Sequence, residues 1–225
     1  MAAKLSKNDL KGPDAFQSTI EVITDYISEN KNRFYAIVTA VVFAAIIAFG
    51  FYMYWSNYQS SAREMYAKAN NMARNVSTPD DARANVKVYQ ELINKYPHSW
   101  SARISHYHLG NIYYNLGEID KAIAEYKKFV SSSRSDNAGI KFLALTSLGY
   151  CYEAKKDIKV AFEYFEKAQK SDNVGFESIG FRNIARMYEQ LNDKKNALEN
   201  YKNALQKTTD PSMTIFIKRK ISSLS

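Results

Sequence analysis

The chain has few of the residue types that build covalent crosslinks and reactive sites. Its 225 residues include one cysteine, three histidines, four prolines and eight glycines. With Cys151 alone, no disulfide can form within the chain. The apolar neighbours Leu148 and Tyr152 predict that this thiol is buried. A lack of disulfides is compatible with either side of a membrane.

The histidines and glycines form none of the patterns that predict catalysis. His106 and His108 are two residues apart, which turns them away from each other on a helix, and no cysteine or carboxylate completes a metal-binding set. The sequence contains no glycine-rich phosphate loop and no nucleophile elbow. We therefore expect a protein that is not an enzyme and that needs no metal or cofactor.

The net charge of +8 belongs to the part of the chain beyond residue 33, because residues 1–33 carry five basic and five acidic side chains. The basic excess is spread along predicted helices, as in Lys127-Lys128, Lys155-Lys156, Lys194-Lys195 and Lys218-Arg219-Lys220. This distribution is typical of solvated helix surfaces. Attraction to anionic lipid headgroups or to an acidic partner is the alternative. No recognition motif or single basic helix is present, so we expect no binding to nucleic acid.

One long stretch has no charge at all. Residues 34–55 are 22 uncharged residues, enough for a helix of about 33 Å that crosses a bilayer. Tyr35 at one end and Tyr52, Tyr54 and Trp55 at the other fit the aromatic belts of a membrane interface. Because 33 residues precede the stretch, we expect an uncleaved membrane anchor and not a signal peptide.

The orientation of this span follows from weak charge signals. Lys31 and Arg33 lie before it, and Arg63 and Lys68 lie after it at greater distance. The closer pair favours a cytoplasmic N-terminus, and large basic domains translocate regardless of charge. The sequence therefore predicts a single-pass inner-membrane protein with a periplasmic C-terminal domain.

The flanks of the span and the span itself suggest further contacts. We expect a flexible tail at 1–13 and an amphipathic cytoplasmic helix at 14–30. This helix could lie along the cytoplasmic headgroups or dock on a protein, and its acidic face favours the protein. Small residues recur every four positions within the span and would let another membrane helix approach closely. Alanine is also simply common in such helices. The ridge consists of Ala36, Ala40, Ala44 and Ala48.

A repeat dominates the rest of the chain. A small residue, an aromatic three places on, an alanine nine further and a second aromatic recur at offsets of 39 and 36 residues. The copies are Leu109-Gly110, Tyr113, Ala122 and Tyr126; Leu148-Gly149, Tyr152, Ala161 and Phe165; and Ile184-Ala185, Tyr188, Ala197 and Tyr201. Each copy alternates two amphipathic helices around a short break. The small residues mark where two helices meet closely, and we expect the aromatics to pack in the core.

This pattern closely resembles the tetratricopeptide repeat over residues 103–211. A degenerate fourth copy precedes it, with Tyr89, Leu92 and Pro97 in its second helix. The resemblance implies an all-α protein: one N-terminal transmembrane helix at 34–55, followed at 56–225 by a solenoid of about four helical hairpins. A last helix carrying Ile215 and Ile217 would cap the stack.

In that family, set positions of each first helix line a concave groove. The resemblance implies a partner groove here whose tyrosines, amides and arginines could contact a peptide. Alternatively, several of these positions are merely exposed. The groove residues are Tyr107, Asn111, Tyr114, Asn115, Tyr150, Glu153, Arg182, Arg186 and Gln190. Recognition of a chaperone's terminal carboxylate is not expected, since Tyr107 and Ser147 replace the Lys and Asn of that subclass.

The layout of short helix, span and repeat domain resembles the bacterial ancillary subunit of the Sec translocon. The resemblance implies a membrane-embedded scaffold whose protein partners are translocon subunits, chaperones or emerging polypeptides. The alternative is a structural subunit of another envelope assembly, such as outer-membrane biogenesis, cell-division or motor machinery. The alanine ridge also allows a homo-oligomer.

Overall fold

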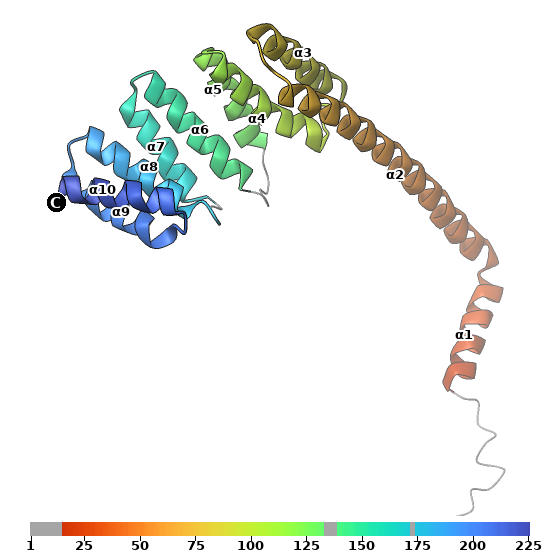
Figure 1. Cartoon of the computed structure of the whole chain (residues 1–225). Coiled ribbons are helices and arrows are strands. Elements are labelled where there is room, and N and C mark those ends of the chain that lie inside the picture. Colours follow the sequence, from red (N-terminus) through yellow and green to blue (C-terminus); the bar gives the residue numbers. More distant parts are fainter. Residues whose placement is uncertain (1–14, 133–138, 172–173) are drawn as a thin grey trace, which may run out of the picture. The chain divides into compact units, whose positions relative to one another are not determined.

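The computed structural model describes residues 15–132, 139–171 and 174–225, so the tail predicted at 1–13 lies outside it. The described residues are helical, with short turns and no strand (Figure 1). The helices are α1 Ala15–Glu29, α2 Lys31–Arg74, α3 Pro79–Lys95, α4 Trp100–Asn115, α5 Ile119–Ser132, α6 Ile140–Ala154, α7 Ile158–Gln169, α8 Glu177–Gln190, α9 Lys194–Lys207 and α10 Pro211–Leu224.

The chain divides into two compact units, Met1–Asn57 and Tyr58–Ser225. In the first unit, the apolar side chains of α2 are exposed, including the whole ridge of Ala36, Ala40, Ala44 and Ala48. By length and composition, α2 is the one helix among the described residues that could cross a membrane. On α1, Ile20 and Ile23 are exposed, while the side chain of Phe16 lies outside the description.

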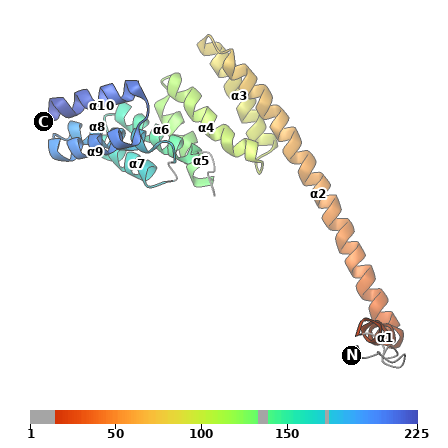
Figure 2. The same cartoon turned by 60° about the horizontal axis from the view of Figure 1, so that its bottom comes forward.

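The second unit is a stack of helical hairpins. The C-terminal part of α2 pairs with α3 through Tyr66, Asn70 and Tyr89, and the Tyr89 hydroxyl donates to Asn70 Oδ1 at 2.8 Å. Three further hairpins follow as α4/α5, α6/α7 and α8/α9, and α10 packs against α9 (Figure 2). The predicted all-α solenoid of about four hairpins with a capping helix is confirmed.

Side-chain caps set where these helices begin. Thr78 and Asp81 form a reciprocal capping box at the start of α3, where Pro79 occupies the first turn. Ser99, Asp157 and Asp193 each accept a backbone N–H at the start of α4, α7 and α9. These caps supply partners for the first N–H groups, which have none inside the helix.

The turn inside each full hairpin has one residue in the left-handed region. These residues are Gly117, Lys156 and Asn192, with φ of 74°, 63° and 59°. In each turn the following N–H reaches back to a carbonyl of the first helix, that of Tyr113, Tyr152 or Tyr188. This arrangement satisfies carbonyls at the helix end and reverses the chain at one geometry in all three copies.

The small residues of the repeat lie where two helices meet. A Cβ added to Gly110 would come within 2.5 Å of the Tyr126 ring, and one added to Gly149 would come within 2.5 Å of the Phe165 ring. The predicted core aromatics Tyr113, Tyr126, Phe165 and Tyr201 are buried, while Tyr152 and Tyr188 are only half-buried. Buried Cys151 also matches its prediction.

Candidate partner-binding groove

The first helices of the three full hairpins carry the predicted groove residues. Helices α4 and α6 contact each other, and side-chain hydrogen bonds connect α6 with α8. This order follows from the stacking of the hairpins, since α5 packs on α6 and α7 on α8. The eight groove positions from Asn111 to Gln190 thereby form two neighbouring groups, one neutral and one charged.

The neutral group surrounds a hollow of about 300 Å³ between α4, α5 and α6. Its walls are formed by amide, hydroxyl and phenol groups, which both donate and accept hydrogen bonds. The Tyr126 hydroxyl donates to Asn111 Oδ1 at 2.6 Å and so fixes one side of that amide. The lining residues are Asn111, Tyr114, Asn115, Tyr126, Ser147 and Tyr150.

A second hollow, of about 400 Å³, adjoins the first. It lies between the end of α2, α3 and α4, and it shares Asn111 and Asn115 with the neutral group. Its other polar side chains are Ser77, Thr78, Asn85, Tyr89 and His108. The repeat pattern does not predict this extension, because the first hairpin is degenerate and its first helix is the end of α2.

The charged group is an ion pair with an amide added to it. Arg186 Nη2 lies 2.8 Å from Glu153 Oε2, and Gln190 Nε2 donates to Glu153 Oε1 at 2.8 Å. The Arg186 guanidinium also lies over the ring of Tyr150, 5.4 Å from its centroid. Both charged side chains are partly shielded from solvent, with 33% and 19% of their surfaces exposed.

Arg182 has a different environment from Arg186. Its Nη2 donates to the Tyr150 hydroxyl at 3.3 Å and to Asn183 Oδ1 at 3.2 Å. Its Nη1 lies 3.9 Å from the sulfur of Met213. The hydrogen-bond acceptors that the described residues provide to Arg182 are therefore all neutral, which leaves its positive charge available to an acidic group.

Glu189 and Asn183 complete the charged end of the groove. Glu189 accepts the Tyr201 hydroxyl at 2.6 Å and the ammonium of Lys220, on α10, at 2.9 Å. Asn183 is buried and accepts the Tyr150 hydroxyl at 3.0 Å. The sequence-based prediction of the groove included neither Asn183 nor Lys220. The place of Asn183 directly before the apolar pair Ile184-Ala185 was its available signal, whereas Lys220 was recognised only as part of the basic run Lys218-Arg219-Lys220.

Tyr107 is placed differently from the other eight predicted residues. Its ring packs 6.0 Å from that of Tyr126 and 5.8 Å from that of Phe129, centroid to centroid. It is half-buried among these rings and lines neither hollow. Its proposed contact with a partner stays a prediction.

Burial keeps the phenol of Tyr114 and the thiol of Cys151 protonated. Burial, followed by the charges of Cys151 and Glu153, raises the pKa of the Tyr114 phenol, and Arg186 opposes that rise. Burial also raises the pKa of the Cys151 thiol to about 12. At neutral pH the groove thus presents a protonated phenol, and the thiol beneath it is not a nucleophile. No group of three metal-ligating side chains occurs among the described residues.

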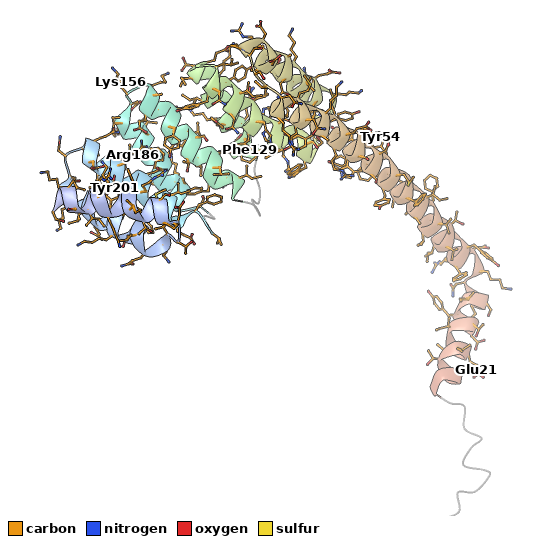
Figure 3. All side chains as sticks on the ribbon, viewed as in Figure 1. Glu21, Tyr54, Phe129, Lys156, Arg186 and Tyr201 are labelled. Carbon is orange, nitrogen blue, oxygen red and sulfur yellow. The ribbon has the colours of Figure 1, made fainter. Side chains whose placement is uncertain are left out.

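Figure 3 marks Arg186 on α8 and Tyr201 on α9, the two helices of the third hairpin, which the hydrogen bond from Tyr201 to Glu189 connects. Helical hairpins in a stack, a groove on the first helices and buried aromatics on the second define a helical-repeat protein of the binding type. Residues 30–225 match the tetratricopeptide repeat-like domain, and the chain belongs to this family.

Solved structures agree on the fold. A tetratricopeptide repeat protein from Parabacteroides merdae superposes with a TM-score of 0.60 at 13% identity, covering 73% of this chain and 60% of that one. PilF from Pseudomonas aeruginosa superposes with a TM-score of 0.57 at 15% identity, covering 75% of this chain and 69% of PilF. MamA from Desulfovibrio magneticus superposes with a TM-score of 0.52 at 17% identity, covering 64% of this chain and 74% of MamA. A search of curated protein sequences found no match.

Proposed function

We propose that this protein is a membrane-anchored scaffold that binds protein partners in the groove and recruits them to the Sec translocon during export. The observation that carries the proposal is the continuity of the binding surface. The two hollows share Asn111 and Asn115, and Tyr150 extends the surface from the neutral hollow between α4, α5 and α6 to Arg182. A surface of this kind suits an extended polypeptide and not a small molecule.

The chemistry of this surface favours a peptide ligand. Amide side chains such as Asn111 and Asn115 can pair with both the N–H and C=O groups of a peptide backbone. Tyr114 and Tyr150 add ring area at low cost in conformational entropy. Arg182, which has neutral neighbours, would accept an acidic side chain or a terminal carboxylate of the partner.

The setting of the scaffold rests on α2. Residues 34–55 would cross the inner membrane, with the N-terminus in the cytoplasm and the repeats in the periplasm. The exposed ridge of Ala36, Ala40, Ala44 and Ala48 would contact a membrane helix of the translocon, or of a second copy of the chain. Periplasmic chaperones and emerging polypeptides are then the partners within reach of the groove.

Site-specific photo-crosslinking in whole cells tests the groove. A photoreactive residue replaces Tyr114, in the neutral hollow, or Glu163, which is exposed on α7, as the matched control. We expect adducts with chaperones or exported chains from position 114 and not from 163. Equal adducts from both positions, or none from 114, would overturn the groove assignment.

The same method applied to Ala44 tests the anchor. Adducts with translocon subunits support the Sec assignment, whereas adducts with subunits of another envelope assembly support the alternative role. A uniform ladder of self-adducts would indicate a structural ring. Proteolysis of residues 56–225 in spheroplasts, but not in intact cells, is the expected result for periplasmic repeats.

A further inference from the structure

The turn between α3 and α4 carries a second surface, which includes none of the predicted groove residues. It runs from Lys95 at the end of α3 to Trp100 at the start of α4. The backbone N–H of His98 donates to the Tyr58 hydroxyl at 3.1 Å, and that of Trp100 donates to Gln59 Oε1 at 3.4 Å. These two bonds attach the turn to the first residues of the second unit.

Chain length alone keeps this turn near the end of residues 34–55. Tyr58 follows Trp55 by three residues, which span at most about 11 Å even when fully extended. The hydrogen bonds to Tyr58 and Gln59 transfer this restraint to the turn. If residues 34–55 lie in a bilayer, the turn is therefore within reach of the headgroup layer, whatever angle the chain adopts between the units.

The side chains of the turn have the chemistry that this layer selects. The Tyr58 and Tyr96 rings pack edge to face with centroids 5.2 Å apart, and Lys95 Nζ lies 5.5 Å from the Tyr96 centroid. Trp100 packs on Tyr66 but remains 50% exposed. Tyrosine and tryptophan prefer the membrane interface, and lysine extends its ammonium toward the phosphates.

We infer that the turn Lys95–Trp100 docks on the periplasmic leaflet, with its aromatic rings among phospholipid headgroups. The inference rests on the proposed membrane anchor. Exposed Glu91, one turn before Lys95, offsets the basic charge. Aromatic insertion thus drives the contact, and zwitterionic lipid suffices. Two attachments, the span and the turn, would hold the repeat stack at a restricted angle and keep its groove at a set height above the bilayer.

The two tryptophans of the chain provide separate reporters. In Trp55→Phe, Trp100 alone reports on the turn; in Trp100→Phe, Trp55 alone reports on the span. The full-length protein is reconstituted in phosphatidylcholine vesicles with or without a headgroup-attached nitroxide quencher. We expect loss of Trp100 emission with the nitroxide, together with protection from aqueous iodide.

A third reporter excludes general adhesion of the repeats to lipid. In the double variant Trp55→Phe/Trp100→Phe, Glu163→Trp places a single tryptophan on the exposed face of α7. It should be quenched by iodide and not by the nitroxide. Adding Tyr96→Ser and Lys95→Glu to Trp55→Phe should restore the iodide quenching of Trp100, with circular dichroism confirming that the helices remain folded.

The outcomes separate the two proposals. A Trp55 that is open to iodide and insensitive to lipid-borne quenchers would overturn the membrane anchor itself. A lipid-protected Trp55 with an iodide-accessible Trp100 would overturn the docking of the turn alone. Equal nitroxide quenching of the tryptophans at 100 and 163 would also overturn it, because the contact would then not belong to the turn.

Discussion

The second and third full repeats solve the same packing problem in different ways. In α6/α7, Gly149 faces the Phe165 ring, and a Cβ there would come within 2.5 Å of it. In α8/α9, Ala185 occupies the equivalent position and is fully buried near Tyr201. The third hairpin therefore accommodates a methyl group that the second excludes. Equivalent positions of the two hairpins thus leave different volumes for the side chain at the interface between the helices.

The largest expected effect comes from exchanging the small residues at positions 149 and 185. Gly149→Ala should lower the free energy of unfolding by about 1 to 3 kcal/mol, because the buried Phe165 ring must move to admit the methyl group. The reverse change, Ala185→Gly, should cost only about 1 kcal/mol through helix propensity. Urea denaturation followed by circular dichroism measures both. A Gly149→Ala variant as stable as the parent would show that the two interfaces are equally permissive.

The hairpin turns extend the comparison to the backbone. Lys156 adopts φ of 63° where the first repeat has Gly117 and the third has Asn192. Because a lysine in this region is strained and glycine is not, Lys156→Gly should raise the unfolding free energy by about 0.5 to 1 kcal/mol. Gly117→Ala should lower it by about 1 kcal/mol. Thermal unfolding of both variants, with Asn192→Gly as a near-neutral control, shows whether each substitution raises or lowers the stability as expected.

Much of this fold was predictable, because the residues of the repeat are set by local packing and by the period of the helix. The helices, the buried aromatics and the close approach at Gly110 and Gly149 follow from residue size and helical period. The groove was less accessible. The pairing of Glu153 with Arg186 joins helices more than thirty residues apart, and Lys220 comes from a capping helix outside the repeat. Such contacts depend on the rotation between hairpins, which no local pattern encodes.

The charged half of the groove is tested by a double-mutant cycle. Glu153→Gln, Arg186→Gln and the double variant should give a coupling of about 0.5 to 1 kcal/mol, since the pair is only partly shielded. Exposed Glu163, changed to Gln, is the matched control and should leave stability unaltered. Additive effects at 153 and 186 would mean that the pair is not coupled and that both groups are free to bind a partner.

The smallest expected effect distinguishes the first repeat from the second. In α4/α5, Glu125 Oε2 lies 2.6 Å from His106 Nδ1, and Oε1 accepts Lys128 Nζ at 2.7 Å. In α6/α7, Leu145 and Tyr164 stand 39 residues after these two. Burial works to raise the pKa of the Glu125 carboxyl, but the hydrogen bonds from His106 and Lys128 outweigh it and lower the pKa.

A lowered folded pKa means that this carboxylate stabilises the fold above its unfolded value of 4.5, and that the contribution is lost as pH falls through the lower, folded value. Glu125→Gln should therefore flatten the dependence of melting temperature on pH below 4.5, whereas Glu163→Gln should not. If the melting temperatures of the parent and of Glu125→Gln fell equally with pH below 4.5, other carboxylates would govern acid unfolding. The first repeat would then be no more acid-sensitive than the second, despite its histidine.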